Sequence, residues 1–203
     1  MANVHVVRHG EVENPKKILY GRQPGWYLSE RGQEMAKTLG EYFKSFDLGA
    51  VHASPLERAQ QTAAPIARAH NLDIKTDERL IEATNVFEGK PFAVGEGALL
   101  RPSAWPKLWN PWRPSWGEPY VDQVNRMLAA VFAARDAANR KDAVVVSHQL
   151  PIWILRSAVE GRRFIHDPRK RMCTLASVTT LHLDSSGQIE GLTYAEPAKH
   201  LLP

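Results

Sequence analysis

The chain has 203 residues, a length that fits one compact domain and leaves little room for two. Hydrophobic residues make up 43% of it and charged residues 24%, which excludes a disordered, fibrous or disulfide-stapled protein. The 26 Lys and Arg exceed the 22 Asp and Glu by four, but the basic residues are spread along the chain without the dense stripe of a nucleic-acid binder. We therefore expect one buried core and no nucleic-acid partner.

Neither a membrane anchor nor a disulfide framework is indicated. No apolar run approaches the roughly 20 residues that span a bilayer. The N-terminus also lacks a basic region followed by an apolar stretch. These features predict a cytoplasmic protein without a membrane partner. The only cysteine, Cys173, has no second thiol with which to pair, so we expect it to be a small buried apolar residue.

Short β-branched runs alternate with helical patterns along the chain. Val4 to Val7 predict a first strand, and a loop follows to about residue 28. Ser29 can then cap a helix, because apolar residues recur at helical spacing from Met35 to Phe46. The elements expected later are a strand at 50–53, a helix to about residue 69, a short strand around Ile74, a helix containing Val121 to Phe132, a strand at 143–146, a helix at about 152–159, and strands near 178–183 and 189–194.

The second helix has a strong predicted start. Ser54 can cap it, Pro55 suits the first helical position, and Glu57 stands three residues after Ser54, as a reciprocal capping box requires.

Strands that alternate with helices predict an α/β fold. We expect a three-layer sandwich with a mostly parallel central sheet and helices on both faces. In such folds ligands bind beyond the carboxyl ends of the strands. His9 and His148 each follow a predicted strand, so this edge of the sheet is the expected site.

The segment between Lys90 and Pro119 departs from this alternation. It holds six prolines and four tryptophans without a sustained helical or alternating pattern. We interpret residues of about 90–119 as a cap insertion within a single domain that spans 1–203. Its tryptophans either pack in the core or form aromatic walls for an apolar or ring-bearing leaving group. They are Trp105, Trp109, Trp112 and Trp116.

Three motifs follow predicted strands in a fixed order. They are RHGE at 8–11, SPLERAQQT at 54–62 and SH at 147–148. From residue 4 to at least 151, this set resembles the histidine phosphatase superfamily, which includes the cofactor-dependent phosphoglycerate mutases. The resemblance implies a phosphoric monoester hydrolase that works through a phosphohistidine. It also implies a small phosphorylated substrate and no need for a metal or cofactor.

Phosphoryl transfer through a histidine needs a neutral imidazole nitrogen that faces phosphorus, and His9 is positioned to be that nucleophile. Charge spreads over the phosphoryl oxygens in the transition state, so fixed cations and donors must surround them. Arg8, Arg58 and His148 suit this role, and an arginine fork matches phosphate geometry.

The leaving alcohol needs a proton, and the attacking water must later lose one. A single carboxyl group can do both. Glu82 is the candidate, because it follows the short strand near residues 79–81 and precedes the Glu-Gly pair at 88–89, like the acid-bearing segment of the family. Glu11 and Glu88 are the rival carboxylates.

Further substrate contacts are expected at three positions. Asn14 takes the place of the phosphate-contacting asparagine, one position earlier than in the mutase motif. Gly21 and Gln149 are expected to offer backbone N–H groups. A basic cluster at 166–171 is expected to be a solvated surface turn, with a second phosphate site or a partner contact as the alternative.

Other readings stay open at this point. A zinc site could use His9, His148 and Glu82, but two neighbouring arginines would repel the cation. A phosphoglycerate mutase would use the same residues and keep the phosphoryl group on the enzyme. A non-catalytic module could hold a phosphorylated ligand under the aromatic cap. The sequence also leaves open whether the chain forms a homo-oligomer.

Overall fold

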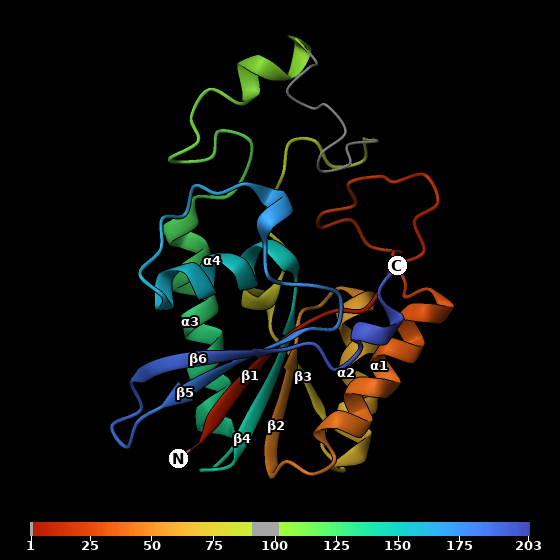
Figure 1. Cartoon of the computed structure of the whole chain (residues 1–203), viewed down its shortest axis with the longest axis vertical. Coiled ribbons are helices and arrows are strands. Elements are labelled where there is room, and N and C mark those ends of the chain that lie inside the picture. The colour runs from red at the N-terminus through yellow and green to blue at the C-terminus, as the bar shows by residue number, and fades with distance from the viewer. Residues whose placement is uncertain (1, 91–101) are drawn as a thin grey trace.

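The computed structural model describes residues 2–90 and 102–203 and shows a layered α/β fold (Figure 1). Within these residues, six strands form one sheet in the order β3-β2-β4-β1-β5-β6. The strands are β1 (Asn3–Arg8), β2 (Leu48–Ala53), β3 (Ile74–Thr76), β4 (Asp142–Ser147), β5 (Val178–Leu183) and β6 (Ile189–Ala195). The α-helices are α1 (Glu30–Phe43), α2 (Glu57–Ala69), α3 (Tyr120–Ala137) and α4 (Gln149–Val159). Short 3-10 helices are η1 (Glu78–Leu80), η3 (Pro102–Lys107), η4 (Pro168–Lys170) and η5 (Lys199–Leu201).

The sheet is mostly parallel, as the sequence predicts. β1 pairs with β4, β4 with β2 and β2 with β3 in parallel, whereas β5 runs antiparallel to β1, and β6 antiparallel to β5. β4 therefore lies inside the parallel part, and its residues Ala143 to Val146 are completely buried, as expected of a strand that is covered on both faces. Because Arg8 pairs with Ser147, β1 and β4 end at the same edge of the sheet.

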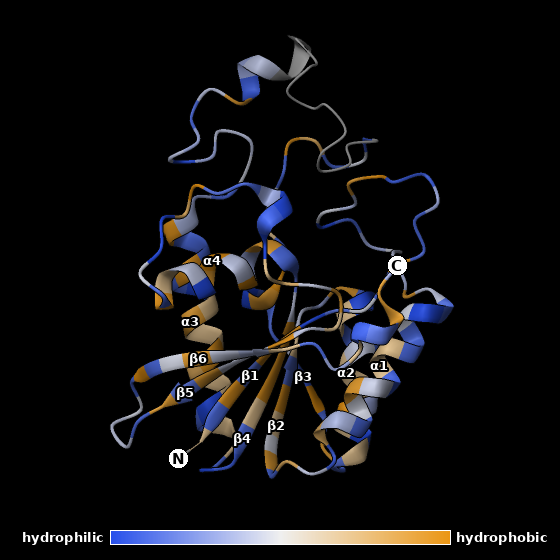
Figure 2. Cartoon of the chain, in the orientation of Figure 1, coloured by the Kyte–Doolittle hydropathy of each residue, from blue (hydrophilic) through white to orange (hydrophobic). Residues whose placement is uncertain are grey.

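Helices cover both faces of the sheet and complete the three predicted layers (Figure 1). Val144 and Val146 join the apolar cluster of α1 and α2, whereas Ala143 and Val145 join the cluster of α3. This division follows from the two-residue period of a strand. Figure 2 shows hydrophobic residues along the strands and hydrophilic residues on the outer turns of α1. The core thus consists of two apolar layers separated by the sheet.

The start of α1 agrees with the sequence prediction, but the start of α2 does not. The Ser29 hydroxyl accepts a hydrogen bond from the Gly32 N–H at 3.0 Å, as an N-cap does. The predicted Ser54 cap is wrong, because α2 begins later, with Leu56 at its N-cap position and no side-chain cap. The Ser54 hydroxyl lies 2.8 Å from His148 Nε2 instead. The Ser54 hydroxyl, which the local pattern assigns to a capping box, thus makes a tertiary contact with His148.

Residues 102–119, the described part of the predicted cap, lie beyond the carboxyl ends of the parallel strands (Figure 1). Its first part, residues 91–101, lies outside the described residues. In the remainder, Trp105, Trp109 and Trp112 are 59%, 73% and 77% exposed, so core packing is wrong for these three. Trp116 is partly buried. Of the four tryptophans, Trp116 is therefore the one that packs partly against the rest of the domain, and it is the best placed to contact a molecule bound there.

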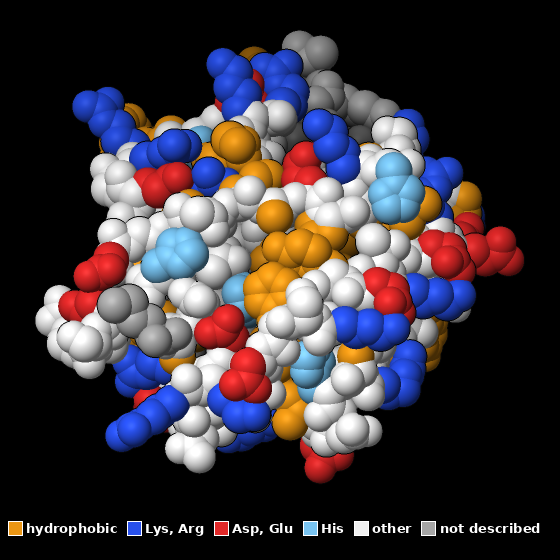
Figure 3. Space-filling model, turned by 60° about the horizontal axis from the view of Figure 1, so that its bottom comes forward, with side chains coloured by type: hydrophobic (Ala, Val, Ile, Leu, Met, Phe, Trp, Pro, Cys, Tyr) orange, Lys and Arg blue, Asp and Glu red, His pale blue; other side chains and the backbone are white. Residues whose placement is uncertain are grey.

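Two further features concern the surface and the cysteine. No helix within residues 2–90 and 102–203 is long and apolar enough to cross a membrane. Lys and Arg side chains are interspersed with Asp and Glu around the face shown in Figure 3, and hydrophobic side chains gather near its centre. The surface charge of this face is thus mixed.

Cys173 is buried and forms no disulfide bond, as expected.

Two glycines allow the start of α1 to approach the turn that follows β1. A Cβ atom on Gly32 would lie 2.0 Å from the Glu11 carbonyl oxygen, and a Cβ atom on Gly10 would lie 2.7 Å from the Gly32 oxygen. Both neighbours are backbone atoms, so the turn itself would have to move to admit a side chain.

We expect Gly32→Ala to destabilise the fold, because overpacking of this kind costs about 1–3 kcal/mol. Denaturant unfolding measures the change in the free energy of unfolding. Gly191→Ala is the control, since a Cβ atom there would meet no heavy atom within 4 Å. Equal stability of the two variants would show that the turn after β1 gives way without cost.

Candidate active site

Three strand ends bring the predicted histidines together. His9 follows β1, His148 follows β4, and Ser54 follows β2 on the other side of β4. The two imidazole rings lie with their centroids 5.1 Å apart and are both buried. The sheet therefore places both histidines at one point, as the sequence predicts from their positions after strands.

His9 has the tautomer that a nucleophile needs. Its Nδ1 lies 2.8 Å from the Gly10 carbonyl oxygen, which can only accept, so Nδ1 carries the hydrogen and Nε2 keeps its lone pair. The Gly10 N–H in turn donates to Thr62 Oγ1 at 3.1 Å. Burial, followed by the nearby charges of Arg58 and Arg8, lowers the pKa of His9 well below its usual value. The imidazole is therefore neutral near pH 7.

Arg8 and Arg58 are oriented by carbonyl groups. Arg8 Nη1 donates to the Cys173 carbonyl at 2.6 Å, and Arg58 Nη2 donates to the Gly21 carbonyl at 2.6 Å. Nε of Arg8, and Nε and Nη1 of Arg58, are buried and have no acceptor among the described residues. Because buried unsatisfied donors are costly, these groups favour a ligand with several oxygen acceptors. A phosphoryl group has this chemistry.

His148 is held by the residue that was expected to cap α2. Because Ser54 Oγ can donate to His148 Nε2 at 2.8 Å, the imidazole can carry its hydrogen on Nδ1, which is buried and has no partner in the described part of the chain. Burial, and then the nearby His9 and Arg58, lower the pKa of His148 well below its usual value. His148 is therefore a neutral imidazole beside His9, with a buried Nδ1 that is available to a ligand.

Glu82 has the properties of a general acid. It follows η1, is half-buried, and accepts a hydrogen bond from the Ala83 N–H at 2.8 Å. Burial raises the pKa of Glu82, against the opposing effects of the Ala83 N–H and Arg58. A carboxyl group that keeps its proton to higher pH can donate it to a leaving oxygen.

The two rival carboxylates, Glu11 and Glu88, make hydrogen bonds that stabilise the loops around them. Glu11 accepts from the Ser29 hydroxyl at 2.6 Å and pairs with Arg31 at 3.3 Å. Glu88 accepts from the Asn85 N–H at 3.1 Å. These contacts favour Glu82 as the acid.

The three residues that were expected to bind substrate, Asn14, Gly21 and Gln149, lie in a loop, a turn and the start of a helix, and Asn14 and Gly21 already make contacts within the protein. The Asn14 amide is used within its own loop, where it donates to and accepts from the backbone of Ile18 at 2.8 and 2.9 Å. Gly21 has a φ of +46° and contributes its carbonyl to Arg58. Gln149 begins α4, three residues earlier than predicted, so its N–H lies in the first turn of a helix. Direct contact of these three with phosphate stays a prediction.

Two further residues are placed differently from what the sequence indicates: Tyr20, which no motif singles out, and Arg171, which belongs to the basic cluster at 166–171. The Tyr20 ring lies against the Arg58 guanidinium, with 4.6 Å from Cζ to the ring centroid. Arg171, which was expected in a solvated turn, points inward and donates from Nε to His166 Nε2 at 2.7 Å. The surface-turn prediction is right for the exposed Arg169 and wrong for Arg171.

The zinc reading finds no support in the side-chain arrangement. Among residues 2–90 and 102–203, no group of three or more His, Cys, Asp or Glu is placed to hold a metal ion.

The buried histidines predict a pH dependence of stability. The unfolded chain takes up protons on its histidines near pH 6.5, whereas folded His9 and His148 stay neutral well below that pH. The unfolded state then binds more protons, so the free energy of unfolding falls as the pH is lowered below about 6.5. We expect His148→Gln to make this fall shallower by up to about 1.4 kcal/mol per pH unit.

Urea unfolding between neutral and mildly acidic pH measures the slope. His200→Gln, at an exposed position, is the matched control and should leave the slope unchanged. Identical slopes for His148→Gln and the wild-type protein would contradict the prediction.

Comparisons with known proteins identify the family of this chain. The protein Rv0525 of Mycobacterium tuberculosis (strain ATCC 25618 / H37Rv), described as uncharacterized, is 51% identical over 195 residues, which cover 96% of each chain. The probable phosphoglycerate mutase GpmB of Proteus mirabilis is 31% identical, over 88% of this chain and 85% of its own. The solved structure of Bacillus stearothermophilus YhfR matches with a TM-score of 0.79 at 26% identity, over 98% of this chain and 100% of that one. The model of the histidine phosphatase superfamily (branch 1) matches residues 4–195, and the chain therefore belongs to that superfamily.

Proposed function

We propose that the chain is a metal-independent phosphomonoesterase that forms a phosphohistidine on His9 and acts on a small phosphorylated metabolite of the cytoplasm. One observation carries this proposal. His9 is fixed in its tautomer, and burial and the nearby charges of Arg58 and Arg8 keep it neutral by lowering its pKa, while buried donors of both arginines have no acceptor in the described part of the chain. This arrangement fits a nucleophile beside a phosphoryl-binding site.

The first step transfers the phosphoryl group to the enzyme. His9 Nε2 attacks phosphorus, an N–P bond forms, and the bond from phosphorus to the bridging oxygen breaks. The electron pair goes to the leaving oxygen, which takes the proton of Glu82. Arg8, Arg58 and the His148 Nδ1–H donate to the phosphoryl oxygens, whose charge changes most in the transition state.

The second step returns the enzyme to its starting state. Water attacks phosphorus and loses a proton to the Glu82 carboxylate, and the N–P bond breaks. Inorganic phosphate leaves, His9 is again neutral and Glu82 is again protonated. The positive charges of the two arginines oppose the binding of a metal cation at the same place, which supports a mechanism without metal.

We expect the purified protein to hydrolyse a simple aryl phosphate in the presence of EDTA. His9→Ala should lower the turnover about a thousandfold or more, because a nucleophile is lost. Phosphate release measures the rate, and His200→Ala is the control at an exposed histidine. Activity that disappears in EDTA and returns with zinc or magnesium would overturn the metal-independent mechanism. Exchange of phosphoryl groups between phosphoglycerates that exceeds phosphate release would indicate a mutase.

We expect Glu82→Gln to separate esters by their leaving group. Alkyl phosphates need a proton from the enzyme, so their kcat/KM should fall about a hundredfold or more, while aryl phosphates with good leaving groups should change far less. In the wild-type protein, kcat/KM for alkyl phosphates should decline as the pH rises through the raised pKa of Glu82, because the acid loses its proton. Equal slowing of both ester classes, or the same selective loss in Glu11→Gln, would show that Glu82 is not the acid.

A further inference from the structure

Exposed apolar side chains are concentrated in two segments of the chain. Among residues 2–90 and 102–203, eight large hydrophobic side chains are exposed, and five of these lie within residues 102–117 and 161–172. The five are Trp105, Trp109, Trp112, Ile165 and Met172. Single exposed hydrophobic residues are common on soluble proteins, but a concentration of them marks an interaction surface.

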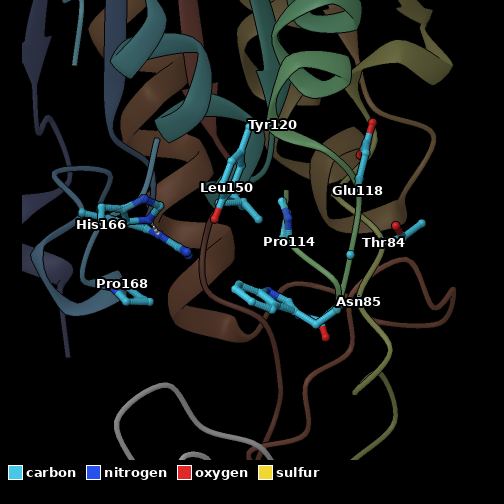
Figure 4. A pocket seen from close by; sticks show the side chains of 11 residues that line it. Thr84, Asn85, Pro114, Glu118, Tyr120, Leu150, His166 and Pro168 are labelled. Carbon is cyan, nitrogen blue, oxygen red and sulfur yellow. Dashed lines mark hydrogen bonds between the residues drawn. The ribbon is translucent and has the colours of Figure 1, made fainter. Parts of the chain in front are cut away.

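The two segments are neighbours in space. One small pocket is lined by side chains of both, namely Pro114, Trp116, His166, Pro168 and Arg171. Figure 4 shows Pro114 across this pocket from His166 and Pro168. Both segments lie beyond the carboxyl ends of the parallel strands, with η3 farthest from the sheet (Figure 1). Residues 102–117 and 161–172 therefore form one region, which we call the cap-side surface.

The cap-side surface carries an excess of positive charge. Residues 102–117 contain one Lys, one Arg and no acidic residue, and residues 161–172 contain five Lys or Arg and a single Asp. That residue, Asp167, pairs with Arg169 at 2.8 Å. Four exposed basic residues of the surface have no carboxylate within ion-pair distance in the described part of the chain, and they are Lys107, Arg113, Arg163 and Lys170. This charge favours a partner that is negative.

The exposed tryptophans are held by local hydrogen bonds. The Asn110 side-chain oxygen accepts from the N–H groups of Trp112 and Arg113, both at 3.1 Å. The Ser115 hydroxyl donates to the Lys107 carbonyl oxygen at 2.8 Å. Prolines restrict the backbone of this segment further. The indole rings are thus presented to solvent by a backbone that has little freedom to lose on binding.

This mixture of side chains fits the surface of an anionic bilayer. Indole rings favour the membrane–water interface, because they join a large apolar ring to an N–H donor. Lys and Arg attract anionic headgroups. Ile165 and Met172 can enter the boundary of the acyl chains, whereas they would not stack on the bases of a nucleic acid. A second copy of the chain is disfavoured, because two surfaces with the same charge repel each other.

We propose that the cap-side surface binds an anionic lipid bilayer, with the indole rings of Trp109 and Trp112 in the interface and with Arg163 and Lys170 against the lipid headgroups. This binding is peripheral and needs no membrane-spanning helix, so it departs from the sequence-based expectation of no membrane partner. It involves no step of the proposed hydrolysis and does not depend on it.

Vesicle flotation tests the proposal with the full chain. We expect the protein to float with vesicles made of equal parts phosphatidylcholine and phosphatidylglycerol, and to stay behind with vesicles of phosphatidylcholine alone. Binding to the anionic vesicles should weaken several-fold in roughly 1 M salt, where the screening length falls to about 3 Å. No flotation with the anionic vesicles, or equal flotation with both kinds, would overturn the proposal.

A double variant tests the role of the indole rings. Trp109→Ala together with Trp112→Ala should lower the partition coefficient about tenfold or more, since binding scales with the apolar area that enters the interface. Tyr27→Ala is the control, because this aromatic residue is exposed and lies outside both segments. It should leave the partition coefficient unchanged. The same loss in the double variant and in Tyr27→Ala would refute a specific role of the cap-side surface.

A second double variant tests the charges. Arg163→Gln together with Lys170→Gln should weaken binding to the anionic vesicles by about fivefold for each charge removed. The matched control is Arg140→Gln together with Lys141→Gln, which removes two exposed charges next to the amino end of β4, at the opposite edge of the sheet. Equal effects of the two double variants would mean that only the net charge matters, and the proposed surface would then be wrong.

Quenching of tryptophan fluorescence by brominated phosphatidylglycerol needs no substitution, so it decides the matter even if a variant fails to fold. We expect the fluorescence of the wild-type protein to fall with brominated vesicles and not with the same vesicles without bromine. Unchanged fluorescence would contradict entry of the indole rings. Tighter binding to single-stranded DNA than to the vesicles, or a dimer that the tryptophan double variant abolishes, would overturn the bilayer as the partner.

Discussion

The parallel pairing of β1 with β4 is the constraint on which the site depends. Pairing of Arg8 with Ser147 ends both strands at one edge, so the next residue of each, His9 and His148, comes to lie beside the other. β2 pairs with the opposite side of β4, and its following residue, Ser54, reaches His148. A shift of one residue in either pairing would turn these side chains to the other face of the sheet. The buried apolar residues of β4 prevent such a shift, so the core of the fold also aligns His9 with His148.

Burial gives the site its chemistry and makes it costly for the fold. It keeps His9 and His148 neutral, because a charged imidazole would lose its hydration beside two arginines. It also leaves guanidinium donors of Arg58 without an acceptor in the described part of the chain. Such groups destabilise the free protein and strengthen the binding of an anion, because no water has to be reorganised around them. The stability that the apolar layers supply on both sides of the sheet offsets this cost.

Local sequence patterns predict the elements well and the contacts between distant segments poorly. The β-branched runs and the Ser29 cap depend on neighbouring residues, so periodicity finds them. Ser54 shows the limit: the same serine fits a capping box locally, yet it binds His148, which is 94 positions away. His9 and His148 could be expected at one edge because each follows a strand of a parallel sheet, and Arg8 and Arg58 could be named because their motifs resemble those of the histidine phosphatase superfamily. Tyr20 could not, because its stacking on Arg58 depends on tertiary packing. Arg171 was noted only as part of a basic cluster, because the sequence does not show that it turns inward beside an exposed Arg169.

The way in which each arginine is oriented determines what it can bind. Arg126 and Arg22 share Glu118, at 2.7 and 3.1 Å, so these charges are balanced within the protein and stabilise the segment before α3. Arg8 and Arg58 are held by backbone carbonyls, which fix a guanidinium without neutralising it. A neutral imidazole and an amide hold Arg171 in the same way. Positive charge that is fixed but unbalanced is available only to a ligand, and its distribution sets which anion fits. In this fold Arg8 and Arg58 are therefore held by backbone carbonyls beside the two histidines that follow the strand ends.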